Sequence, residues 1–396
     1  MKYMSTKVDN NAVLKMNSFI ISSIVFLNIY QIGLNWLFGI SFNMAIEYLF
    51  VPLLFMINKF QLEVFRNYKL VFYMYFMILS FTITFYLNNN AMLPYYFNHF
   101  VLYGLILLIV FLFPINHEYL YKYILWHSYA ITLIYMAALF MEKVSIIHDY
   151  MTWGYYCVFG LSFILCDAII NKKFLKLLCS IPLLGITFIN GPKGAIIVIA
   201  ALLIICFYSM TNSWLKRALM LIIISILALN FVSLLNGLIK ILENISFTAN
   251  SYFINSLKSI LSVDKISGVF DNRDFIYEYG ILTIKENVFG VGIGKFQSIY
   301  GVFPHNIFLD IFSTYGIILG GLIVVFLVYE VITCYMAVKN KKQLIIFIVV
   351  LSNSFKLLVS KTFIYDPVFW LLICIMAIIK GKKDNLSNSD NNRVSE

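Results

Sequence analysis

Long apolar segments follow one another along most of the chain, separated by short polar stretches. Each holds about 20 residues, enough for a helix to cross about 30 Å of hydrocarbon. The apolar residues are continuous and do not alternate with polar ones, which excludes an outer-membrane barrel and predicts an all-α polytopic membrane protein. We expect about twelve spans, near residues 17–38, 42–58, 69–87, 97–115, 121–140, 151–171, 174–190, 194–211, 216–235, 305–338, 343–361 and 366–380.

One polar stretch is far longer than the others and divides the chain. Residues 1–235 form an N-terminal bundle of about nine expected spans, and residues 236–304 form a large late external loop. Residues 305–380 form a second bundle of about three spans, and the polar residues 381–396 predict a disordered cytoplasmic tail. The spans are nearly free of charge, so any chemistry is expected where the external loop meets the membrane.

Composition agrees with this pattern. Hydrophobic residues make up 61% of the chain and charged residues 12%, whereas a soluble domain carries about 25% charged residues. The six cysteines lie in or beside apolar runs without a CxxC pair, which predicts small membrane-buried residues and not disulfides. No cluster has the spacing of metal ligands, so neither a metal nor another cofactor is expected.

The basic residues predict the orientation. About two thirds of the 29 Lys and Arg residues lie in alternate loops on one side, which the positive-inside rule assigns to the cytoplasm. Both termini are then cytoplasmic, and the loop 236–304 faces outward, to the periplasm or the cell exterior. The formal charge of +10 reflects this loop bias, so nucleic acid is not expected as a partner.

The later half of the external loop carries the motifs. A helical stretch near 275–286 follows Arg273, and alternate glycines then stand at Gly290, Gly292 and Gly294. Glycines permit close backbone approach and unusual dihedral angles. The pattern indicates a structural turn or a direct contact with a substrate.

Pro304-His305-Asn306 leads into the next span. Because proline fits the first position of a helix, His305 is expected in the first turn, at the outer end of a membrane helix. Backbone N–H groups there favour an anion, and His305 could add a hydrogen bond or a proton-transfer group. Asn306 and Asp310 are four residues apart and share a face. A structural role is the alternative reading for a single histidine at an interface.

Farther along this span, Gly316 and Gly320-Gly321 have the spacing of small residues at a helix-packing surface. The apolar run over 305–338 is also longer than a bilayer requires, which leaves room for a tilt or a break.

These motifs together resemble the bacterial O-antigen polymerase and ligase superfamily, which includes the Wzy-like polysaccharide polymerases. The run NVFGVGIGKF over 287–296, His305-Asn306 before a span, and YGIILG over 315–320 are similar to the glycine-rich element, the His-Asn pair and the glycine-containing continuation of that family. Arg273 stands where the family carries an upstream arginine. The family's Ser-Arg-Gly element is represented by Pro-Lys-Gly at 192–194, with Lys193 in place of the arginine.

The resemblance implies a GT-C-like membrane architecture and a metal-independent glycosyltransferase. Its donor would be a glycan linked to undecaprenyl diphosphate, attacked at the anomeric carbon by a hydroxyl of the acceptor. Arg273 and Lys193 would clamp the departing diphosphate, and His305 would hydrogen-bond it or act as the acceptor's base. Further substrate contacts are expected from Asn306, Asp310, Gly292 and Gly294.

Several functions fit this chemistry. The leading interpretation is an O-antigen or capsular polysaccharide polymerase, and the alternative is a ligase that moves finished glycan to lipid A core or another acceptor. A flippase for lipid-linked oligosaccharides fits less well, because transporters carry charges in several spans. Expected partners are the lipid-linked substrate, membrane lipids, a chain-length regulator and a flippase.

Two further groups of residues on the outer side are expected to have structural roles. Lys356 and Lys361 are expected to snorkel to the interface, with contact to phosphate as the alternative. The cluster of Tyr95, Tyr96 and His99 is expected to form an interfacial aromatic belt, with stacking on sugar rings as the alternative.

Overall fold

The computed structural model describes residues 10–40, 45–59, 67–141, 143, 146–190, 192–211 and 274–381, together with isolated positions between 213 and 240. All regular elements in this part of the chain are helical, as the sequence predicts. Arg273 and most of the external loop before it lie outside the described residues.

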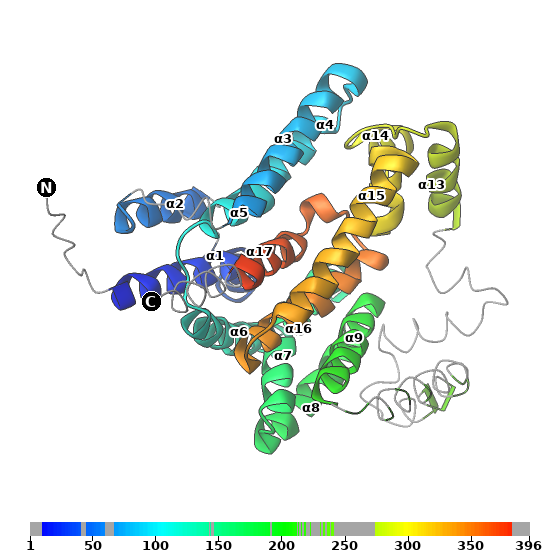
Figure 1. Ribbon diagram of the computed structural model, residues 1–396. Helices are drawn as coiled ribbons and strands as arrows, with labels where there is room; N and C mark the ends of the chain where they lie inside the picture. The colour runs from blue at the N-terminus through cyan, green and yellow to red at the C-terminus, as the bar shows by residue number, and fades with distance from the viewer. Residues whose placement is uncertain are drawn as a thin grey trace, which may run out of the picture.

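The helices form one bundle in which early and late segments lie side by side (Figure 1). The first half contains α1 (Asn10–Phe38), α2 (Ala45–Ile57), α3 (Tyr68–Asn88), α4 (Leu93–His99), η1 (Phe100–Leu105), α5 (Ile106–Val110), α6 (His117–Phe140), α7 (Ile146–Ile170), α8 (Phe174–Asn190) and α9 (Lys193–Met210). The second half contains α13 (Asp274–Glu286), α14 (Lys295–Tyr300), α15 (Ile307–Ala337), α16 (Lys341–Ser354), η3 (Phe355–Leu358), η4 (Phe363–Tyr365) and α17 (Pro367–Gly381).

Six helical segments in the described part are long and apolar enough to cross a membrane. Three shorter apolar helices, within α8, α9 and α17, coincide with expected spans near 174–190, 194–211 and 366–380. The chain is therefore a multi-pass membrane protein. The expected span near 343–361 is interrupted, because α16 ends at Ser354 and two short 3-10 turns follow.

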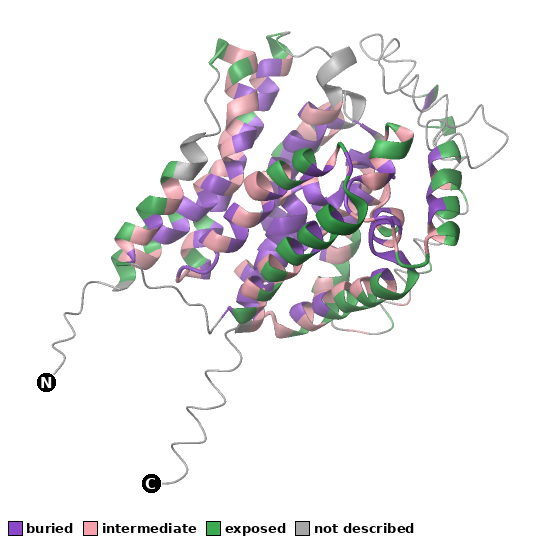
Figure 2. Cartoon of the chain, turned by 90° about the horizontal axis from the view of Figure 1, so that it is seen from above, coloured by how far each residue is buried: buried purple, intermediate pink, exposed green. Residues whose placement is uncertain are grey.

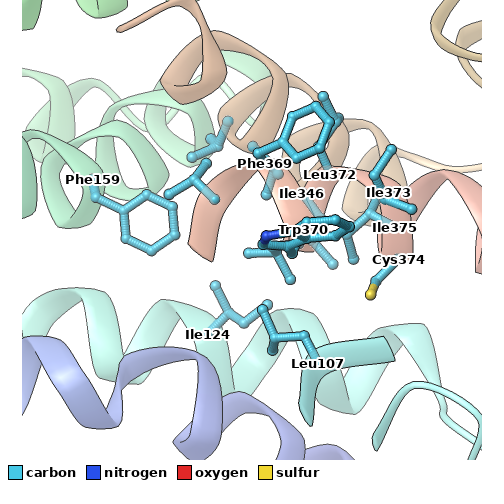
Figure 3. Packing of buried hydrophobic residues seen from close by; sticks show 14 of the residues in the cluster. Leu107, Ile124, Phe159, Ile346, Phe369, Trp370, Leu372, Ile373, Cys374 and Ile375 are labelled. Carbon is cyan, nitrogen blue, oxygen red and sulfur yellow. The ribbon is translucent and has the colours of Figure 1, made fainter. Parts of the chain in front are cut away.

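Burial separates inner helices from lipid-facing ones. The apolar window of α7 is 94% buried, whereas that of α15 is only 17% buried. Figure 2 shows buried residues gathered on the inner helices and exposed ones on the outer faces. Trp370 of α17 lies at the centre of the packing, near Leu107 and Ile124 (Figure 3), and its indole Nε1 donates to the Ile364 carbonyl at 3.1 Å. All six cysteines are free thiols, and five of them are buried.

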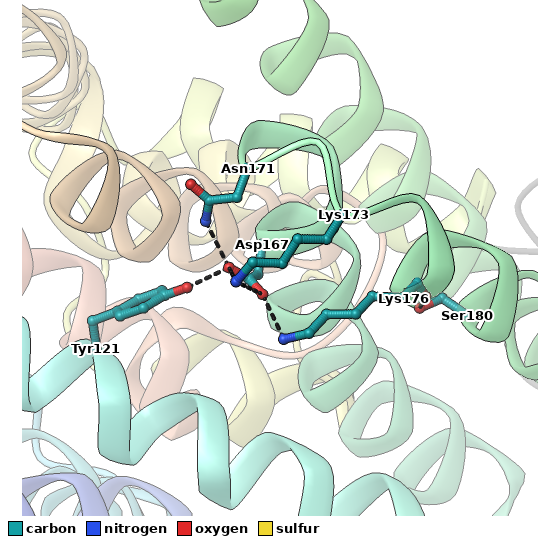
Figure 4. A network of polar contacts seen from close by, with 6 residues as sticks. All are labelled: Tyr121, Asp167, Asn171, Lys173, Lys176 and Ser180. Carbon is teal, nitrogen blue, oxygen red and sulfur yellow. Dashed lines mark hydrogen bonds and ion pairs between the residues drawn. The ribbon is translucent and has the colours of Figure 1, made fainter.

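Charged side chains are also buried in the bundle, contrary to the expectation of nearly charge-free spans. The fully buried carboxylate of Asp167 in α7 receives hydrogen bonds from Tyr121 and Asn171 and ion pairs from Lys173 and Lys176 (Figure 4). A buried carboxylate needs such partners to offset the loss of hydration. Tyr121 lies in α6, Asn171 and Lys173 lie on the loop after α7, and Lys176 lies in α8, so the network ties α6, α7 and α8 together at one end.

A break in α15 positions the glycine-rich segment. At Gly316 the backbone leaves the helical region, with φ 78° and ψ 178°, so the helix does not satisfy the carbonyls before it. The N–H groups of Val291 and Gly292 donate to the carbonyls of Ser313 and Thr314, at 2.8 and 3.0 Å. A Cβ atom on Gly316 would lie 2.1 Å from the Val288 carbonyl oxygen. Gly316 therefore marks a break and a docking point. The length of the apolar run left room for a break, but the glycine spacing itself suggested a packing surface.

Candidate active site

The His-Asn pair lies just before α15. Asn306 is the N-cap, and its side-chain oxygen accepts hydrogen bonds from the N–H groups of Phe308 and Leu309, at 2.9 and 3.3 Å. The expectation that His305 lies in the first helical turn is wrong. Asparagine is a strong N-cap, so the helix begins at Ile307, directly after Asn306. His305 has a φ of 53°, which turns the chain immediately before the helix.

Asn306 and Asp310 both connect α15 to the turn between α16 and α17. The Asn306 amide donates to the Leu358 carbonyl at 3.1 Å. The carboxylate of Asp310 is buried and accepts a hydrogen bond from the Thr362 hydroxyl. These contacts fix the start of α15 against residues 355–366, and a direct contact of either residue with substrate stays a prediction.

The same turn holds a buried ion pair that sequence reasoning missed. Lys356 Nζ lies 2.8 Å from the Asp366 carboxylate, and the two residues are 3% and 0% exposed. Asp366 also caps α17 by accepting from the Val368 N–H at 2.9 Å. The expectation of snorkelling is therefore wrong for Lys356, because η3 turns its side chain inward.

The N-terminus of α9 meets this turn. Lys193 is the first residue of α9, and its side chain lies outside what the structure describes. A Cβ atom on the adjacent Gly194 would lie 2.1 Å from the Tyr155 hydroxyl, so the helix start packs closely on that ring. Lys356 Nζ lies 5.6 Å from the centroid of the same ring. The structure thus brings the expected phosphate-binding element at 192–194 next to the turn that contacts Asn306.

Aromatic residues from both halves of the chain gather beside His305. We call Tyr95, Tyr96, His99, Phe303, His305 and Tyr365 the outer aromatic cluster. The ring centroids of His99 and Tyr365 are 4.6 Å apart, those of Tyr365 and Phe303 6.5 Å, and those of Phe303 and His305 4.2 Å. These contacts join residues that are far apart in the sequence. An interfacial belt does not require such contacts, and they also suit a platform on which sugar rings stack.

Tyr365 is held at the centre of this cluster by its hydroxyl, which donates to Gln297 Oε1 at 3.4 Å. Burial raises the pKa of Tyr365 well above its usual value. The phenol therefore stays neutral and keeps its proton for the hydrogen bond.

The glycine-rich segment lies against the first half of the chain. Gly292 and Gly294 have φ values of 85° and 74°. Between them, the Ile293 N–H donates to the Thr84 hydroxyl at 3.2 Å, and its carbonyl accepts from the Asn90 amide at 3.0 Å. These contacts explain the glycines by backbone conformation, and their proposed contact with substrate stays a prediction.

The described residues contain no group of three His, Cys, Asp or Glu side chains that could hold a metal ion. The outer groups that the structure describes are two histidines, aromatic rings and the lysines of the turn.

Comparison with known proteins gives one match. Neither the curated proteins nor the solved structures contain a match to this chain. A family model described as O-antigen ligase matches residues 178–326, which include α9, the glycine-rich segment, His305-Asn306 and the break at Gly316. This match confirms, over residues 178–326, the resemblance to the bacterial O-antigen polymerase and ligase superfamily that the motifs indicate.

Proposed function

We propose that the chain is a glycan polymerase of the bacterial plasma membrane. It would transfer a growing O-antigen or capsular glycan from undecaprenyl diphosphate to the next lipid-linked repeat unit, on the outer face. The family supports a glycosyltransferase or ligase acting on lipid-linked glycans. Both termini would be cytoplasmic, as the distribution of basic residues indicates.

One observation carries this proposal: three separate segments meet beside His305. The turn at 355–366 holds the N-cap Asn306 through Leu358 and carries Lys356. The α9 start at Lys193 packs beside the same turn, through Tyr155. A histidine, a helix N-terminus with a lysine and an aromatic platform are therefore neighbours at one end of the bundle.

These groups suit the two demands of the transfer. A hydroxyl oxygen of the acceptor sugar bonds to the anomeric carbon, and the bond from that carbon to the diphosphate oxygen breaks. Undecaprenyl diphosphate leaves with the electron pair, and the N-terminus of α9 with Lys193 and Arg273 would stabilise its charge. His305 would accept the hydroxyl proton or hydrogen-bond the diphosphate.

The buried residues of the turn have a positioning role in this scheme. Asp310 and Thr362 hold α15 to the turn, and the Lys356–Asp366 pair fixes where α17 begins. Gly292 and Gly294 would fix the backbone position of the glycine-rich segment beside the bound glycan.

A ligase is the second candidate, because the matching family includes both polymerases and ligases. It would use the same donor and the same groups but deliver finished glycan to lipid A core or another terminal acceptor. A chain-length regulator and a flippase would act beside a polymerase.

Purified protein in lipid nanodiscs with lipid-linked repeat units tests the reaction directly. We expect chains of two or more repeats and release of undecaprenyl diphosphate, both unchanged by EDTA. Chain growth lost in EDTA and restored by a divalent cation would reject a metal-independent transfer. Transfer that occurs only to added lipid A core would identify a ligase.

A further inference from the structure

A long apolar groove lies between α3, α15 and α17. Its volume is about 240 Å³, and its lining is formed only by apolar and aromatic residues. On its rim, Leu319 and Leu322 of α15 are 44% and 63% exposed, so the groove opens toward the surrounding lipid. Along α15 it runs from Ile311 to Leu327, roughly 24 Å at 1.5 Å per residue, which is most of a hydrocarbon core.

The two ends of the groove differ in charge. At the outer end, Ile311 follows the buried carboxylate of Asp310 directly in the chain. At the other end, Tyr73 lies one helical turn from Lys69, and Phe326 lies one turn from Glu330. The groove thus begins beside an acidic group and ends beside a cluster that contains lysines.

That cluster has a net positive charge. Lys69 Nζ and Lys380 Nζ lie 3.0 and 3.1 Å from the same oxygen of Glu330, so two ammonium groups face one carboxylate. The Glu330 side chain is 3% exposed, whereas those of Lys69 and Lys380 are 24% and 16% exposed. The lysines can therefore reach an added anion while the carboxylate stays covered.

We propose that this end of the groove binds an anionic phospholipid of the inner leaflet. Its phosphate contacts Lys69 and Lys380, and one acyl chain lies in the groove between α3 and α15. The head group is placed at this end because Lys69 and Lys380 are partly exposed there, whereas the Asp310 carboxylate at the outer end is buried and bonded to Thr362. This site is separate from the proposed glycan transfer and does not depend on it.

Occupancy of the groove would also brace α15. The acyl chain would contact Ile323, Phe326 and Leu327 of α15, near the end of the groove that holds the two lysines. Because a ligand that binds only the folded protein stabilises it, a bound lipid is expected to raise the thermal stability of the protein.

Native mass spectrometry of the full-length protein tests the proposal, with phosphatidylglycerol compared with phosphatidylcholine of identical acyl chains. We expect phosphatidylglycerol to bind more tightly. Glu330→Gln removes the opposing charge and should tighten phosphatidylglycerol about fivefold, the effect of about 1 kcal/mol per basic group. Lys69→Gln should weaken it by a similar factor, which provides a second test if Glu330→Gln fails to fold.

The groove is tested by a matched pair on one helix. Ile323→Trp fills the groove and should weaken binding, whereas Val325→Trp lies on the lipid-facing side of α15, 68% exposed and outside the lining, and should not. Equal binding of the two phospholipids would overturn the proposal. Equal effects of the two tryptophan variants would also overturn it. The same holds if Glu330→Gln and Lys69→Gln both fold and both bind phosphatidylglycerol as tightly as the unaltered protein does.

Discussion

The imidazole of His99 packs against the phenol ring of Tyr365, with ring centroids 4.6 Å apart. His99 ends α4 in the first half of the chain, and Tyr365 ends η4 in the second half. Through Phe303 the contact extends to His305, so two histidines from distant parts of the sequence share one aromatic surface. We propose that sugar rings of the substrate stack on this surface, beside His305.

Substitutions at Tyr365 separate the ring from its hydroxyl. Tyr365→Ala removes the centre of the platform and should lower chain growth by about tenfold, since stacking of a ring is worth about 1 kcal/mol or more. Tyr365→Phe loses only the hydrogen bond to Gln297 and should retain most activity. The measurement is the initial rate in nanodiscs as a function of substrate concentration.

Tyr329→Ala is the control for this pair, because Tyr329 is a 58% exposed tyrosine far along α15. Equal rates for Tyr365→Ala and Tyr329→Ala would show that the outer aromatic cluster is only an interfacial belt.

Breaking the buried ion pair should destabilise the protein. Lys356→Met leaves the Asp366 carboxylate buried without its cation, a change that costs about 3–5 kcal/mol. Lys361→Met serves as the control, because Lys361 is partly exposed and its ammonium lies 5.9 Å from the Tyr156 ring centroid. Thermal unfolding in detergent, followed by size-exclusion chromatography, should show a large loss for the first variant only. Similar melting of both variants would mean that the pair contributes little.

Two glycines of α15 provide a matched test of the helix break. Gly316→Ala places a Cβ 2.1 Å from the Val288 carbonyl oxygen and forces alanine into a positive φ, so a loss of about 2 kcal/mol or more is expected. Gly321→Ala meets only Phe312, at 3.9 Å, and should be neutral or slightly stabilising. The measurements are the yield of folded protein and the melting temperature of each variant. Indistinguishable values for the two variants would argue against a helix break at Gly316.

The membrane helices follow from the sequence because continuous apolar runs leave the backbone no partner in lipid except itself. The break at Gly316 did not follow, since it depends on N–H groups of Val291 and Gly292 that dock from another segment. A glycine spacing along one helix cannot show which backbone approaches it.

The sequence predicted the candidate site only in part. Pro304-His305-Asn306 indicated a helix start with polar groups, and the structure moves that start from Pro304 to Ile307 because Asn306 caps the helix. The inward turn of Lys356 depends on a buried partner, Asp366, and the contact between His99 and Tyr365 joins residues far apart in the chain. Neither of these two contacts can be predicted from a local sequence pattern.

The most direct test is glycan profiling by gel electrophoresis and mass spectrometry in cells that lack the protein, rescued with the unaltered chain or with His305→Ala. Immunoblots of the membrane fraction establish equal amounts of the two proteins. The account predicts single repeat units on the final carrier after deletion, long chains with the unaltered protein, and single units again with His305→Ala. A normal distribution of chain lengths with His305→Ala at equal abundance would contradict the central claim that His305 belongs to the reacting site.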